Sequence, residues 1–101
     1  MTPELTFQAT FTGELFTWRG PSPYHFIAVP PEVGDEIRSM ASLLTYGWGV
    51  IPVRGLVGGT SFTTSLFPKD GGYLLPIKDA VRKGEALQVG DVVAVELTVG
   101  R

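Results

Sequence analysis

Residues 51–66 read IPVRGLVGGTSFTTSL, and the architecture of the chain follows from them. Two β-rich runs flank Gly58-Gly59, and both glycines can adopt the positive φ that a two-residue hairpin turn requires. Such a turn sets the register of the hairpin, so we expect four cross-strand pairs: Val57 with Thr60, Gly55 with Phe62, Val53 with Thr64, and Ile51 with Leu66. These residues form a mostly apolar face, whereas the opposite face is polar and carries Pro52, Arg54, Leu56, Ser61, Thr63 and Ser65.

Both ends of the chain show the alternation that is typical of half-buried strands. Apolar residues there occupy every second position: Leu5, Phe7, Ala9, Phe11, Val93, Val95, Leu97 and Val99. Gly13 predicts a bulge or a bend, after which the first strand continues to Trp18. Further β-rich runs at 24–29 and 73–77 bring the number of expected strands to six.

Two short helices are expected between the strands. Pro31 suits a helix start, and apolar residues then recur at helical spacing, so we expect an amphipathic helix over residues 31–44. A second helix is expected over residues 78–84 and is ended by Gly84. Both helices follow a strand and a proline, which is compatible with a duplicated half-barrel.

Six strands around one core predict a closed β-barrel, because closure removes exposed strand edges. The expected fold class is therefore all-β (mostly β), a closed six-stranded barrel with two short capping helices, in which residues 1–101 form a single domain. Seven side chains are predicted to be largely buried: Phe7, Phe11, Val53, Phe62, Val93, Val95 and Leu97.

The composition argues against several kinds of site. The chain has no cysteine and a single histidine, His25, so no metal site and no cofactor is indicated. Eight basic and ten acidic residues give a net charge of -2, which does not supply the basic surface of a nonspecific DNA-binding protein. We therefore expect no meaningful affinity for duplex DNA. The sequence shows neither a long apolar run nor a leader-type start at residues 1–4, so we expect a cytoplasmic protein without membrane contact.

Two groups of residues carry a resemblance to a known family. They comprise Trp48–Gly55, Gly58-Gly59 and Thr64–Pro68, followed by Gly72–Lys78, Val81–Lys83 and Gly90-Asp91. Together they resemble a bacterial and archaeal family of domains of unknown function, found alone or fused to a bacteriocin-protection-type (OmpD-associated-like) domain. The resemblance spans nearly the whole chain and implies a closed six-stranded barrel of the double-split type, related to transition-state regulators. The resemblance provides no established activity and no catalytic residues that could be transferred to this chain.

Three motifs have a plain structural explanation beside a functional one. The segment Leu56–Ser61 is rich in glycine, but it lacks the Lys-Ser/Thr ending of a phosphate-binding loop, which favours a hairpin turn. Ser61 and Ser65 do not lie in a nucleophile elbow. A lone histidine in a strand, His25, is more typical of a structural or exposed residue than of a catalytic base. Trp18 and Trp48 are either core or rim aromatics.

One constellation has the chemistry of a binding site. Arg54 shares the polar hairpin face with Thr63 and Ser65, and a planar guanidinium beside hydroxyl groups suits a carboxylate or a phosphate. Lys78 and Arg82 are four residues apart, so they project from one side of a helix and could approach the same anion. The predicted anion site is Arg54, Ser65, Lys78 and Arg82, with Tyr24 or Trp48 as an aromatic wall. Solubilising surface charges are the alternative explanation.

The leading hypothesis is a non-enzymatic domain that binds a small acidic ligand or a protein partner. The alternative is a divergent DNA-binding or antitoxin-like transcriptional regulator, against which the acidic charge balance argues. A third hypothesis is an enzyme that uses His25 as a single base, and the lack of partner residues argues against it.

Overall fold

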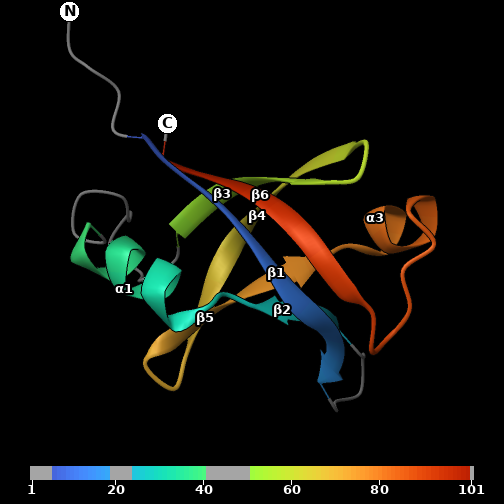
Figure 1. Ribbon diagram of the computed structural model, residues 1–101, viewed down its shortest axis with the longest axis horizontal. Coiled ribbons are helices and arrows are strands. Elements are labelled where there is room, and N and C mark those ends of the chain that lie inside the picture. The colour runs from blue at the N-terminus through green and yellow to red at the C-terminus, as the bar shows by residue number, and fades with distance from the viewer. Residues whose placement is uncertain (1–5, 19–23, 41–50, 101) are drawn as a thin grey trace, which may run out of the picture.

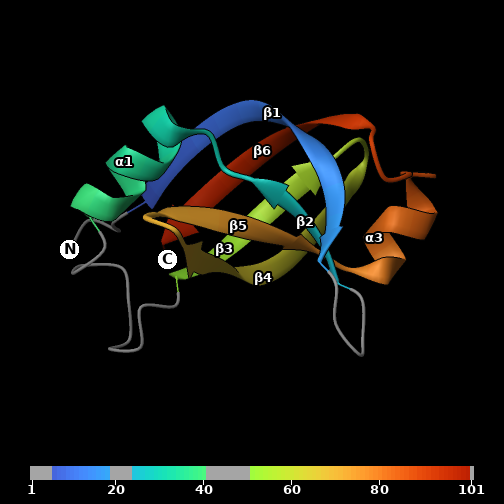
Figure 2. The ribbon, with the colours of Figure 1, turned by 90° about the horizontal axis from the view of Figure 1, so that it is seen from below.

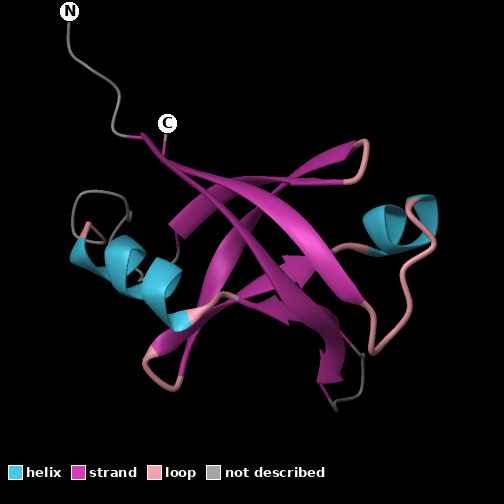
Figure 3. Cartoon of the chain, viewed as in Figure 1, coloured by secondary structure: helices cyan, strands magenta, loops and turns pink. Residues whose placement is uncertain are grey.

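Six antiparallel strands close into a barrel in the computed structural model, which describes residues 6–18, 24–40 and 51–100 (Figure 1). The strands are β1 (Thr6–Trp18), β2 (Tyr24–Ala28), β3 (Ile51–Val57), β4 (Thr60–Lys69), β5 (Gly72–Ile77) and β6 (Val92–Gly100). Neighbouring strands follow one another around the barrel in the order β1-β2-β5-β4-β3-β6. The predicted all-β fold class is confirmed, and strands dominate the view coloured by secondary structure (Figure 3).

The β3–β4 hairpin has the predicted register. Val57 lies opposite Thr60, Gly55 opposite Phe62, and the pairing continues to Ile51 and Leu66. Gly58 has a φ of 58°, whereas Gly59 does not have a positive φ, so the turn needs a positive φ only at its first residue. The ring of Phe62 lies directly over Gly55, where an added Cβ would meet it at 2.5 Å. Glycine is therefore needed at position 55 to admit the aromatic ring to the barrel interior.

β1 is a single continuous strand that serves both sides of the barrel. It pairs with β6 as far as Glu14 and with β2 from Leu15 onward. Just before this change of partner, a Cβ on Gly13 would approach the side chain of Ile27 to 2.5 Å. The glycine thus permits the close approach at which β1 curves over the barrel (Figure 2).

The barrel interior is filled with apolar side chains, and none of the described residues is a buried polar or charged one. Five of the seven side chains predicted to be buried are so: Val53, Phe62, Val93, Val95 and Leu97. The prediction was too strong for Phe7 and Phe11, which are half-buried and pack against the margin of the core. They face inward by alternation, but they do not lie at the centre of the core.

The two helices of the described residues lie at opposite ends of the barrel (Figures 1 and 2). α1 (Pro31–Ser39) begins at the predicted proline and buries Ile37. Met40 follows it as a turn, and residues 41–44 of the expected helix lie outside the described residues. α3 (Asp79–Gly84) ends at Gly84 as predicted and buries Val81. Lys78, predicted as its first residue, precedes it in an extended conformation. Among the described residues, no helix has the length and apolarity needed to cross a membrane.

The topology has the symmetry that a duplicated half-barrel requires. The described elements run strand, strand, helix, strand, and then repeat that order from β4 to β6. If β1 is exchanged with β4, β2 with β5 and β3 with β6, the same pairs of strands remain neighbours in the barrel. The β2–β5 pair therefore lies at the centre of this pseudo-symmetry, flanked on both sides by a long strand.

Candidate functional site

The outside of the barrel carries two surfaces of opposite character. The polar face covers β6, β3 and the adjoining parts of β1 and β4, and its outward residues include Gln8, Thr10, Arg54, Leu56, Ser61, Thr63, Ser65, Glu96 and Thr98. The aromatic face covers β2, β5 and the remaining ends of β1 and β4, and it consists of Phe16, Trp18, Tyr24, Phe26, Phe67, Lys69, Leu74 and Pro76. Because the interior is filled with apolar side chains, the barrel of the described residues offers its outer surfaces rather than a central cavity.

Phe26 forms the centre of the aromatic face. Four rings surround it at centroid distances of 6.1 to 6.4 Å: Phe16, Trp18, Tyr24 and Phe67. This ring of neighbours leaves Phe26 only 7% exposed, although it points out of the barrel. The neighbours themselves stay open to solvent, with exposures of 39% for Trp18, 64% for Tyr24 and 55% for Phe67. The result is a buried aromatic floor with exposed aromatic walls.

A basic side chain completes one side of the aromatic face. The Nζ atom of Lys69 lies 3.2 Å from the centre of the Trp18 ring, a cation–π contact. The two residues border an open pocket of about 370 Å³, lined by Phe16, Thr17, Trp18, Lys69, Asp70 and Leu74. This pocket combines an apolar floor with an ammonium group, a hydroxyl group and a carboxylate at its margin.

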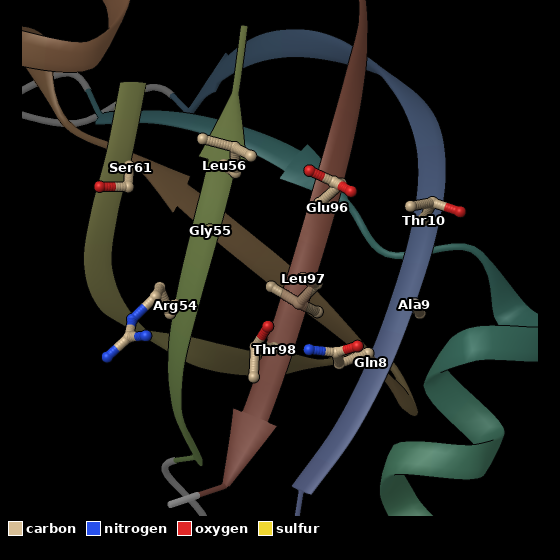
Figure 4. Close-up of a pocket in the computed structure, with 10 residues that line it drawn as sticks. All are labelled: Gln8, Ala9, Thr10, Arg54, Gly55, Leu56, Ser61, Glu96, Leu97 and Thr98. Atoms are coloured by element: carbon tan, nitrogen blue, oxygen red, sulfur yellow. The ribbon is translucent and has the colours of Figure 1, made fainter. Parts of the chain in front are cut away.

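The polar face contains a shallow depression, also of about 370 Å³ (Figure 4). Its outward side chains are mainly hydroxyls and amides, with Arg54 and Glu96 as the charged members. Arg54 lies opposite Thr98 on β6 and Thr63 on β4. It forms no ion pair with a carboxylate of the described residues. The depression carries one basic group and one acidic group, so it has no excess of positive charge.

The members of the predicted anion site lie in different surroundings. Arg54 and Ser65 share the polar face, since Ser65 pairs with Pro52, two residues from Arg54 along β3. Arg82 lies on α3 and pairs with Asp79 at 3.5 Å, and neither Arg82 nor Lys78 lines the depression. Lys78 is exposed and follows the last residue of β5. A shared anion site for all four residues stays a prediction.

The glycine-rich turn and His25 have structural surroundings. Glu85 lies against the turn, where its carboxylate would overlap a Cβ on Gly58, and it accepts a 2.6 Å hydrogen bond from Thr60 Oγ1. A carboxylate at this point repels phosphate, which agrees with the interpretation as a hairpin turn. His25 is half-buried between Thr17 on β1 and Ile77 on β5.

Sequence reasoning missed the aromatic face as a unit, although part of the signal was present. Leu15 is an inward residue, so alternation places Phe16 and Trp18 outward. Trp18 is a rim aromatic of the barrel exterior, which decides one of the two options left open for it. The gathering of Phe26 and Phe67 beside them depends on the strand order β1-β2-β5-β4, which the local pattern does not contain.

Comparison with known families gives a match over most of the chain. Residues 11–97 match the model described as Domain of unknown function (DUF1905). The chain belongs to the DUF1905 family. The match confirms the predicted membership of a family of domains of unknown function, and it covers every strand of the barrel in whole or in part. No curated protein matches the sequence.

Proposed function

We propose that this DUF1905 domain is a non-enzymatic interaction module that binds a protein partner through its aromatic face. The observation that carries the proposal is the cluster of exposed rings, Trp18, Tyr24 and Phe67, around the buried Phe26. A cytoplasmic location of the protein stays an expectation from the sequence.

The three rings pack against Phe26, but large parts of each remain exposed to solvent. An aromatic side chain has an area of about 150–250 Å², so the three exposed fractions amount to roughly 300 Å² of apolar surface. Contiguous apolar patches of this size on a monomer are often functional. Aromatic residues are also enriched among the few side chains that provide most of the binding energy in protein interfaces. These arguments support recognition by the aromatic face.

The two other hypotheses have less support. A DNA-binding regulator needs clustered basic groups to neutralise phosphates, whereas the depression of the polar face holds Arg54 together with Glu96. An enzyme that uses His25 as a base needs a partner group to orient the imidazole, and the cross-strand neighbours of His25 are Thr17 and Ile77.

The proposal is tested by selection from a phage-displayed library of random twelve-residue peptides. We expect the wild-type protein to enrich peptides that do not bind the Tyr24→Ser/Phe67→Ser variant. The matched control is Val92→Ser, which removes an apolar side chain that is 73% exposed elsewhere on the barrel and should bind the same peptides. Thermal unfolding checks that all variants fold.

Two outcomes of the selection would contradict the proposal. One is a lack of enriched peptides for the wild-type protein. The other is enrichment of peptides that bind Tyr24→Ser/Phe67→Ser as well as they bind the wild-type protein, because such peptides recognise another surface.

A further inference from the structure

The aromatic face contains one charged side chain at a defined place, and this identifies the chemistry of the partner. We propose that the pocket bordered by Trp18 and Lys69 receives an acidic residue together with an adjacent apolar side chain from an extended segment of the partner. This inference rests on the proposed function and adds to it the class of peptide that is recognised.

Lys69 supplies the positive charge for such an interaction. Its ammonium group lies 3.2 Å from the centre of the Trp18 ring, and it forms no ion pair with a carboxylate of the described residues. An ammonium group has three donors and no acceptor, and a ring face occupies only part of this capacity. The Trp18 ring therefore holds Lys69 at the border of the pocket while its charge stays available for an incoming carboxylate.

The apolar half of the pocket fits a single side chain. Its floor contains Phe16 and Leu74, and Leu74 is only 8% exposed. A volume of about 370 Å³ lies at the lower end of the range for ligand pockets, about 300–1,000 Å³. A leucine or phenylalanine of an extended peptide can enter this space while the neighbouring residue reaches Lys69.

The available area favours a short segment over a second folded copy of the chain. The three exposed rings provide roughly 300 Å² of apolar surface, whereas a stable interface buries about 800 Å² on each partner. The outside of a closed barrel is also convex, so two barrels touch over a limited area. An extended peptide can lie along the pocket that Trp18 and Lys69 border without this restriction.

Charge around the pocket orients the peptide. Asp70 lines the outer margin of the pocket, in the turn between β4 and β5, where its φ is 51°. Its carboxylate repels a second acid, so the acidic residue of the partner has to approach Lys69 from the side that faces away from Asp70 and that the Trp18 ring leaves open. Lys78 is an exposed second cation beyond the other end of β5. The aromatic face thus lies between two lysines.

A double-mutant cycle with defined peptides tests the inference. The probes are two fluorescein-labelled peptides of identical length, one in which aspartate alternates with leucine and phenylalanine and one in which asparagine replaces every aspartate. Fluorescence anisotropy measures their binding to the wild-type protein, to Lys69→Gln and to Lys69→Arg. Lys83→Gln is the control, because it removes an exposed lysine on α3, away from the aromatic face.

We expect the aspartate peptide to bind the wild-type protein about threefold to fivefold more tightly than the asparagine peptide at low salt, the range for a partly exposed ion pair. Lys69→Gln should remove this preference, Lys69→Arg should retain it, and Lys83→Gln should leave it unchanged. Added salt should reduce it in the wild-type protein. A coupling of this kind assigns the preference to the contact between Lys69 and the carboxylate.

Three results would overturn the inference. The first is equal binding of the two peptides to the wild-type protein, and the second is equal weakening of both peptides by Lys69→Gln. Either result leaves the proposed function intact if selected peptides still depend on Tyr24 and Phe67. The third is self-association in sedimentation velocity that Phe67→Ser abolishes, because a second copy of the chain would then occupy the aromatic face.

Discussion

β1 and β4 each run along both outer surfaces of the barrel, and each changes character part-way. The outward residues of β1 are polar beside β6, from Gln8 to Glu14, and aromatic beside β2, at Phe16 and Trp18. Those of β4 are serine and threonine beside β3 and become Phe67 and Lys69 beside β5. The inward residues of both strands remain mainly apolar over their described lengths.

The inward and outward positions of β1 and β4 are therefore under different constraints. A filled interior requires apolar side chains at inward positions, and both halves of each strand provide them. Outward positions are free to be polar, as the polar face shows. The aromatic residues on the other face cover Phe26, but this packing does not account for the area of Trp18, Tyr24 and Phe67 that stays exposed. Recognition of a partner provides an explanation for that area.

The largest expected effect on stability is at the centre of the aromatic face, and it can be compared with a substitution at the centre of the polar face. Phe26→Ala should lower the free energy of unfolding by about 3–5 kcal/mol, the range for a buried phenylalanine, because Phe26 is only 7% exposed. Phe62→Ala in the interior should cost a similar amount. Thr98→Ala, at the centre of the polar face, should stay within about 0.5 kcal/mol of the wild-type protein. Urea unfolding measures all three, and a cost below about 1 kcal/mol for Phe26→Ala would contradict the described packing.

A smaller effect is expected at the margin of the aromatic face. Lys69→Ala removes the contact with the Trp18 ring, and an exposed cation–π pair contributes about 0.5–1 kcal/mol. Thermal unfolding should show a loss of this size. Trp48→Phe as the background allows the fluorescence of Trp18 to be followed alone. An unchanged Trp18 emission on substitution of Lys69 would show that the two side chains are not in contact in solution.

The smallest effect on stability is expected for Arg54 on the polar face. Arg54→Ala should change the free energy of unfolding by less than about 0.5 kcal/mol, since the side chain is exposed and forms no ion pair among the described residues. The same variant tests the predicted anion site. Phosphate and small dicarboxylates should raise the melting temperature of the wild-type protein, and Arg54→Ala should abolish the increase. No increase for the wild-type protein would remove the anion site.

Arg82→Ala tests the second half of that predicted site. Arg82 contacts Asp79 on α3 through one Nη atom at 3.5 Å, and a guanidinium has five donors, so donors remain for an anion. Loss of the anion-dependent increase in Arg82→Ala would place Arg82 at the anion together with Arg54. An unchanged increase would limit the site to Arg54 and its neighbours on the polar face.

The sequence predicts the elements that depend on local rules. The register of the β3–β4 hairpin follows from its two-residue turn, and the inward residues of β6 follow from alternation. The end of α3 follows from Gly84. Phe7 shows where alternation stops being sufficient, because inward direction does not determine how deeply a side chain is covered.

The candidate site depends on information that local patterns lack. Phe26 and Phe67 are neighbours only because β5 pairs with both β2 and β4. The contact between Lys69 and Trp18 joins residues from the two ends of the aromatic face. The predicted anion site was based instead on residue types in the β3–β4 hairpin and near α3. The distance between these two regions cannot be predicted from local sequence patterns.

The most direct test of the aromatic face as a recognition surface is nuclear magnetic resonance of the ¹⁵N-labelled protein. A peptide enriched by the wild-type protein is titrated in, and the amide chemical-shift changes are mapped on the barrel. We predict that the largest changes fall in residues 16–18, 24–28 and 67–76. Largest changes in residues 8–10, 54–56 and 94–98 would place recognition on the polar face and would contradict binding by the aromatic face.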